Sequence, residues 1–153
     1  MSADVSTKSQ QHYLSVIRQG DVLGKYGRQG GMKTRSFILS RDGQRLEFRG
    51  RGTRMHRIPF KSVMLVAPGR ESANFKSKDS ALLKSNPEKL RALSRISFSM
   101  HYYDADGFSR SLDVQCLGNQ DRQRSPGEQY EIWFTGLSML VRDCGIPESC
   151  NAF

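Results

Sequence analysis

The chain has 153 residues, of which 37% are apolar and 25% are charged, and its formal net charge at pH 7 is +9. This length predicts one domain with a core of its own, and the lack of any run of about 18 apolar residues argues against a membrane-spanning helix. The polar N-terminus, MSADVSTKSQQ, has no apolar stretch of the kind found in secretory signals, so we expect a cytoplasmic protein.

The positive charge is concentrated in one part of the chain. Residues 25–61 contain 11 of the 24 Lys and Arg residues but only two acidic residues, which leaves 13 basic and 13 of the 15 acidic residues elsewhere. A solvated surface usually mixes both signs of charge, so a block of one sign favours an anionic partner such as the phosphate of a lipid or of a nucleic acid.

The cysteines and histidines do not form a metal-binding pattern. The three cysteines are odd in number and have no C-x-x-C spacing, and the three histidines lie far apart in the sequence. We therefore expect no disulfide framework, no metal site and no cofactor, and we expect Cys116 to belong to the core.

The first half of the chain predicts short strands. Residues 1–11 are expected to be a flexible leader, and residues 12–18 a short helical turn. Strands are then predicted at 21–26, 34–40 and 45–49, separated by the glycine-rich loop GRQGGMK and by an Asp-Gly hairpin turn at residues 42–43. Residues 56–67 predict one strand or two strands joined by a bend.

A weaker pattern follows. The segment of about residues 70–95 is too long for an ordinary connection and polar enough to lie outside the core, with a short helix predicted from Asn86 through Leu93. Strict alternation then returns at residues 96–102, and a hairpin turn at 104–107 leads to a return strand at 109–117.

One amphipathic helix is predicted near the C-terminus, over residues 125–145. Ser125, Pro126 and Glu128 form a capping box at its start, and Gly145 followed by Pro147 predicts its end. An apolar stripe with helical spacing runs between these positions, and it consists of Tyr130, Trp133, Phe134, Leu137, Leu140 and Val141. We expect the helix to cover one open end of a small antiparallel sheet or barrel, and residues 147–153 to form a loose tail.

The order of these elements, together with three local motifs, resembles a pleckstrin homology (PH) domain. The motifs are the entry KYGRQGGMKTRSFILS, the Ser-Leu-Asp of a late strand at residues 111–113, and the single tryptophan, Trp133, followed by Gly-Leu at residues 136–137. The similarity is greatest to the PH domains of phospholipase C enzymes and of certain plant regulators. It implies a mainly β fold, a seven-stranded, strongly bent antiparallel barrel capped by one C-terminal helix. The domain would occupy residues 12–146, with an insertion at about 70–95 and with Trp133 as the structural anchor of the helix.

The resemblance also implies a phosphoinositide-binding site on the first hairpin, formed by Lys25, Lys33 and Arg35. Lys33 and Arg35 are two residues apart on one strand and so point to one side, and the hairpin brings Lys25 beside them. Three cations can surround one phosphate, with the arginine able to donate two parallel hydrogen bonds. Secondary contacts with anions or with the membrane surface are expected from Arg28, Arg49, Arg51, Arg54 and Arg57.

Several functions remain open from the sequence. We favour binding to phosphoinositides or to the anionic inner leaflet, with peripheral membrane association. The alternative is a docking module for another protein, which would bind through the helix, a strand edge or the 70–95 segment. Nucleic acid is less favoured because no exposed aromatic platform and no groove-entering helix is evident, and we expect no enzymatic activity because no catalytic motif is present.

Overall fold

Seven strands form one antiparallel sheet in the computed structural model, which describes residues 2–146; the predicted tail at 147–153 lies outside the described residues. The strand order is β4-β3-β2-β1-β7-β6-β5. The strands are β1 (Asp21–Tyr26), β2 (Met32–Leu39), β3 (Arg45–Arg49), β4 (Met55–Pro59), β5 (Val63–Pro68), β6 (Ser97–Tyr103) and β7 (Ser109–Gln115). The helices are α1 (Ser2–Gln19), α2 (Ala73–Ser85), α3 (Pro87–Ser94) and α4 (Pro126–Arg142), with a 3-10 turn, η1 (Phe60–Ser62), between β4 and β5.

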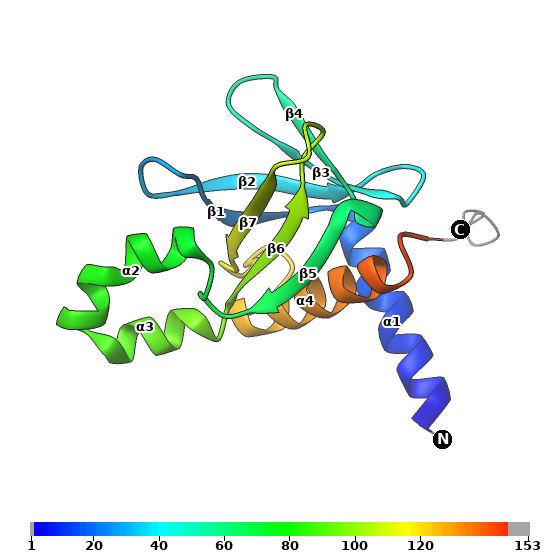
Figure 1. Cartoon of the computed structure of the whole chain (residues 1–153). Helices are drawn as coiled ribbons and strands as arrows, with labels where there is room; N and C mark the ends of the chain where they lie inside the picture. The colour runs from blue at the N-terminus through cyan, green and yellow to red at the C-terminus, as the bar shows by residue number, and fades with distance from the viewer. Residues whose placement is uncertain (1, 147–153) are drawn as a thin grey trace.

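The sheet is strongly bent at β1, where its two halves meet. β1 pairs with β2 on one side and with β7 on the other, and β1 and β2 run across the direction of β6 and β7 (Figure 1). The ladder does not close into a full barrel, because β4 and β5 are the two edges of the described sheet. The predicted fold class, mainly β with seven bent antiparallel strands and a C-terminal helix, is therefore confirmed.

α4 begins at the predicted capping residue and ends at Arg142, three residues before the predicted stop at Gly145. The hydroxyl of Ser125 accepts a hydrogen bond from the Glu128 amide at 3.1 Å, and Gly145 has the positive φ of +99° that follows many helix ends. Trp133 is fully buried on the inner side of the helix, and its ring meets that of Phe37 edge-on at 6.5 Å. The helix thus packs over the bent sheet and fills the core from one end.

The N-terminal segment is more helical than expected. Instead of a flexible leader and a short turn, the described chain has one helix from Ser2 to Gln19, and this helix packs against α4. Val16 and Ile17 are buried, and a Cβ atom at Gly136 of α4 would overlap the Cδ1 atom of Ile17. Glycine at this position therefore allows the two helices to approach closely.

The 70–95 segment is folded against the sheet, although none of its residues belongs to the main cluster of buried apolar side chains. It forms α2 and α3, and α3 has the predicted start, with Asn86 accepting from the Lys89 amide at 3.1 Å. Phe75 of α2 is fully buried, as are most atoms of Arg70 and Asp79. Leu83 of α2 is 60% exposed.

Candidate anion-binding site

A cavity of about 830 Å³ opens at the end of the sheet away from α4. It lies between the β1–β2 loop (residues 27–31), the β3–β4 loop (50–54) and the β6–β7 turn (104–108), with the N-terminus of α2 at one side. The basic and imidazole side chains that line it are Lys25, Arg28, Arg54, His56, His101 and Arg110. Segments far apart in the sequence therefore bring positive charge to one place.

The β1–β2 hairpin has the register that the sequence analysis required. Lys25 lies directly opposite Lys33, and Leu23 lies directly opposite Arg35. Residues directly opposite in an antiparallel ladder point to the same face, and Leu23 is fully buried. The hairpin therefore turns Lys25, Lys33 and Arg35 toward the inner face of the bent sheet, where this face reaches the open end.

Lys25 is the most enclosed of these three cations. It is half-buried, and its Nζ lies 5.7 Å from the ring centroid of Phe48, within the range of a cation–π contact. Burial lowers the pKa of Lys25, the charge of Arg35 lowers it further, and the carboxylate of Asp113 opposes this change. A bound anion would favour the charged form of Lys25 and so relieve this cost.

Lys33 and Arg35 lie beside the cavity on β2. Lys33 is exposed, and the guanidinium of Arg35 donates to the carbonyl oxygen of Thr34 at 2.9 Å. Of the three residues predicted to hold a headgroup, only Lys25 lines the cavity itself. The side chains of Lys33 and Arg35 would need to turn toward the cavity to contact the same phosphate.

The five secondary residues are divided between two faces of the sheet. Arg28 and Arg54 line the cavity, and Arg51 is exposed in the β3–β4 loop. Arg49 lines a separate groove on the outer face, and the Nε of Arg57 lies 3.1 Å from a carboxylate oxygen of Glu47 on that same face.

His56 was not predicted as a site residue. It lies directly opposite Phe48 in the β3–β4 ladder, and the two rings are stacked with centroids 4.9 Å apart. Burial lowers the pKa of His56, and the charges of Arg54 and Lys25 lower it further. The sequence gives one signal for this position, since alternation in β4 places His56 on the same face as the buried Ile58.

Most of the acidic groups in the cavity wall already have partners. Asp104 accepts hydrogen bonds from the amides of Asp106 and Phe108 and from the Nε of Arg110, the last at 2.8 Å. Asp113 is buried and accepts from four side chains. The four donors to Asp113 are neutral and leave its charge uncompensated, whereas Asp104 is paired with Arg110. The cavity wall therefore holds four Lys and Arg side chains and three aspartates.

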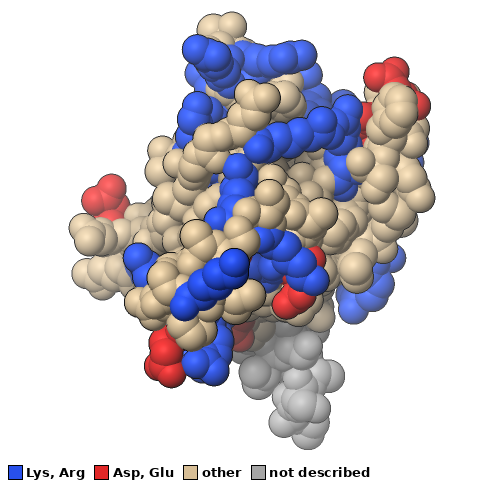
Figure 2. All heavy atoms as spheres, turned by 60° about the vertical axis from the view of Figure 1, so that its left-hand side comes forward, with Lys and Arg blue, Asp and Glu red and all other residues tan. Residues whose placement is uncertain are grey.

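Basic side chains are also prominent on the surface beside this end, with smaller groups of acidic side chains among them. Figure 2 turns the left-hand side of Figure 1 toward the viewer, and Lys and Arg side chains extend over much of this face from top to bottom. Within residues 2–146, no group of three or more His, Cys, Asp or Glu side chains is placed to hold a metal ion. None of the described helices is long and apolar enough to cross a membrane.

Comparison with known proteins supports the fold. No protein-family model matches the chain. Among solved structures, the chain is similar to the inner membrane complex sub-compartment protein 3 (ISP3) of Toxoplasma gondii, with a TM-score of 0.55 over 90% of this chain and 86% of that one, at 7% sequence identity. At this identity the likeness shows the fold alone, and the fold is PH-like. Greater similarity to the phospholipase C type stays a prediction.

Proposed function

We propose that this domain binds phosphoinositide headgroups at the open-end cavity and thereby attaches its protein to the anionic inner leaflet of a membrane. The observation that carries the proposal is the convergence of Lys25, Arg28, Arg54 and His56, from two separate hairpins, on one cavity of about 830 Å³. A phosphorylated inositol ring presents several anionic oxygens, and side chains that surround it from several directions can contact more than one phosphate.

The charge of the whole domain supports the same function. The surplus of basic residues lies in residues 25–61, which form β1 to β4 and the loops at the open end. Each cation near an anionic bilayer contributes on the order of 1 kcal/mol of attraction, which falls with added salt. Diffuse attraction would bring the domain to the surface, and the headgroup in the cavity would lengthen its stay.

The test is co-sedimentation with vesicles that contain each phosphoinositide in turn, at low and high salt. We compare two variants that each lose two positive charges. The cavity variant is Lys25→Ala/Arg54→Ala, and the outer-face variant is Arg49→Ala/Arg57→Ala. We expect the cavity variant to lose at least roughly tenfold in affinity, whereas the outer-face variant keeps most of its binding at high salt. An equal loss in both variants would show attraction by charge alone and would refute the site.

The variant Lys33→Ala/Arg35→Ala then decides whether β2 contributes to the same site. A loss as large as that of the cavity variant would show that both side chains turn toward the headgroup. Binding that is unchanged would assign the site to the cavity residues without β2.

Docking of another protein is the second candidate, and one observation favours it. A groove of about 370 Å³ lies on the outer face of β1 and β2, where Val22 and Ile38 are 46% and 38% exposed and Arg49 and Arg122 line the same groove. An apolar floor flanked by arginines fits an acidic peptide with apolar side chains. Binding of such a peptide that is lost in Val22→Asp, together with no vesicle binding by the wild type, would favour this function.

A further inference from the structure

Two side chains of α2 hold the backbone of the β1–β2 loop. The amide nitrogen Nδ2 of Asn74 donates to the carbonyl oxygens of Tyr26 and Gly27 at 3.2 and 3.3 Å. The Nζ of Lys78 donates to the carbonyl oxygens of Arg28 and Gly30 at 3.3 and 2.7 Å. Positions 74 and 78 are one helical turn apart, so one face of α2 contacts three carbonyl groups of the loop and that of Tyr26 at the end of β1.

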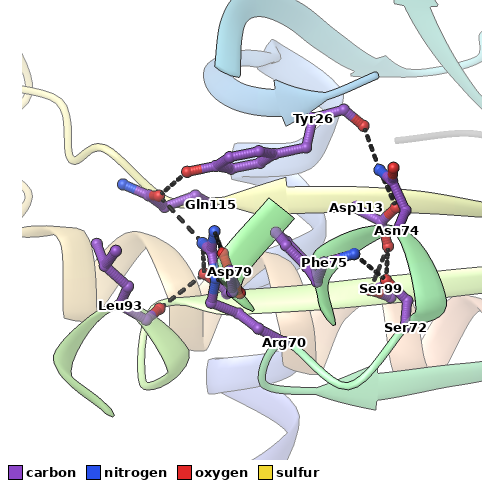
Figure 3. A network of polar contacts seen from close by, with 11 residues as sticks. Tyr26, Arg70, Ser72, Asn74, Phe75, Asp79, Leu93, Ser99, Asp113 and Gln115 are labelled. Carbon is purple, nitrogen blue, oxygen red and sulfur yellow. Dashed lines mark hydrogen bonds and ion pairs between the residues drawn. The ribbon is translucent and has the colours of Figure 1, made fainter. Parts of the chain in front are cut away.

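α2 can act as a rigid support because a buried ion pair fixes it to the sheet. The Nε and Nη2 atoms of Arg70 donate to the two carboxylate oxygens of Asp79 at 2.8 and 2.9 Å, and only 3% and 10% of these side chains are exposed. The guanidinium also lies against two neighbouring rings, 4.6 Å from the centroid of Tyr26 and 4.2 Å from that of Phe75, and these two rings contact each other at 5.1 Å (Figure 3). Tyr26 is the last residue of β1, so this cluster joins α2 to the strand that leads into the loop.

The same arginine reaches β6 and β7. Its Nη1 donates to the hydroxyl of Ser97 at 3.1 Å and to the side-chain oxygen of Gln115 at 3.2 Å. The Gln115 oxygen also accepts from the hydroxyl of Tyr26 at 2.6 Å, and the Ser97 hydroxyl donates to the carbonyl of Leu93 at the end of α3. One connected network therefore links β1, β6, β7, α2 and α3.

A second anchor holds the N-terminus of α2. Ser72, the residue that caps the helix, donates from its hydroxyl to the buried carboxylate of Asp113 at 2.6 Å. The other donors to this carboxylate are Asn74, Ser99 and Ser111, at 3.0, 2.6 and 3.0 Å. Asn74 thus contacts Asp113 and the β1–β2 loop at the same time, and it connects the buried network directly to the loop.

From these contacts we propose that α2 holds the β1–β2 loop in the conformation needed for anion binding, with Lys78 and Asn74 as the positioning residues. The loop contains Gly27, Gly30 and Gly31, and glycine loses more backbone freedom than other residues when it is ordered. If α2 holds the loop in place before the ligand binds, the loop loses this conformational entropy during folding and not during binding. Arg28, at the cavity wall, is then already in place.

The binding part of this inference rests on the proposed function, whereas the ordering of the loop does not. The first measurement therefore needs no ligand: it is backbone amide hydrogen exchange at residues 27–31, together with the rate of tryptic cleavage after Arg28. Lys78→Met removes the donor but keeps the length of the side chain. Lys84→Met removes the same charge from an exposed position of the same helix and serves as the matched control.

We expect Lys78→Met to raise exchange and cleavage in the loop by about two- to tenfold, the range that corresponds to the loss of one or two hydrogen bonds. Lys84→Met should match the wild type, and Lys78→Arg, which keeps charge and donors, should restore most of the protection. Asn74→Ala provides a second, independent break of the same contact. If Lys78→Met and Asn74→Ala both exchange like the wild type, α2 does not hold the loop and the proposal is overturned.

The second measurement is titration with inositol hexakisphosphate as a soluble probe. If the wild type binds it, Lys78→Met should lose affinity by about the same factor by which loop exchange rises, while Lys84→Met loses much less. Equal losses in these two variants would show that Lys78 acts only through its charge, and would overturn the positioning role. If the wild type binds neither this probe nor vesicles, the proposed function fails, and the exchange data alone decide whether α2 orders the β1–β2 loop.

Discussion

Lys25 and Lys33 face each other directly across the β1–β2 ladder, with a third cation, Arg35, two residues further along β2. Like charges directly opposite each other destabilise a sheet, and burial of Lys25 adds to this cost by lowering its pKa. The positive charge of this cluster, at the edge of the cavity, therefore does not stabilise the folded state. This is the pattern expected of a binding site.

The first prediction is that Lys25→Met stabilises the protein in the absence of ligand. At neutral pH we expect the free energy of unfolding to rise by up to about 1 kcal/mol, because the opposed charge is removed and Met fits the apolar contact with Phe48. The pKa of folded Lys25 lies below its ordinary value of 10.5, so the cost of its charge is fully present at neutral pH and disappears as pH rises from the folded pKa to 10.5. Urea unfolding at several pH values measures this difference.

Lys61→Met is the control, because Lys61 is exposed and lies in η1, outside the cavity. It should leave the free energy of unfolding within about 0.5 kcal/mol of the wild-type value. A Lys25→Met protein that is less stable than the wild type at neutral pH would contradict the prediction.

The second prediction concerns the buried pair Arg70–Asp79. Arg70→Met should reduce the free energy of unfolding by about 3–5 kcal/mol, because it leaves the carboxylate of Asp79 buried without its partner. The double variant Arg70→Met/Asp79→Leu should be more stable than Arg70→Met alone, since neither uncompensated charge remains. A double-mutant cycle measured by chemical unfolding tests this, and strictly additive effects would mean that the pair is not coupled.

This network also explains why the packing of the 70–95 segment against the sheet was not predicted. In β6, Ser97 and Ser99 alternate with Phe98 and Met100. Both serines are buried, and they belong to the two hydrogen-bond networks that anchor α2: Ser97 accepts from Arg70, and Ser99 donates to Asp113. Apolar periodicity does not detect a helix held mainly by polar contacts.

The candidate site was predictable only where it depends on local register. The spacing of Lys25, Lys33 and Arg35 fixes their common face once the hairpin is assumed. The presence of His56 and Arg110 depends on how the β3–β4 and β6–β7 hairpins converge at the open end. That convergence arises from the bend of the whole sheet, which pairing patterns within single hairpins do not determine.

The third prediction tests whether α1 is an integral part of the domain. Ile17 is fully buried and contacts α4 at Gly136, so Ile17→Ala should cost about 2–5 kcal/mol through lost burial and the cavity that remains. Val22→Ala removes apolar atoms from a position that is 46% exposed, and its effect should be much smaller. Thermal unfolding of both variants measures the difference, and similar midpoints would mean that α1 adds little to the stability of the domain.

The fourth prediction concerns the effect of pH through His56. Its pKa is lowered from 6.5, first by burial and then by the charges of Arg54 and Lys25, so between the folded pKa and 6.5 the unfolded chain holds more protons. Stability should therefore fall as pH decreases through this window, and His56→Gln should lack this step. The same substitution at His12, which is exposed on α1, controls for the removal of a histidine.

A bound phosphate reverses this balance, because an anion beside the ring favours the imidazolium form. If the cavity is the binding site, the affinity of the wild type should increase relative to that of His56→Gln as pH falls below 6.5. Because both proteins receive the same ligand, protonation of the phosphate itself cancels in this comparison. Parallel pH profiles for the two proteins would place the bound anion away from His56, and therefore outside the part of the cavity that Phe48 and Lys25 enclose.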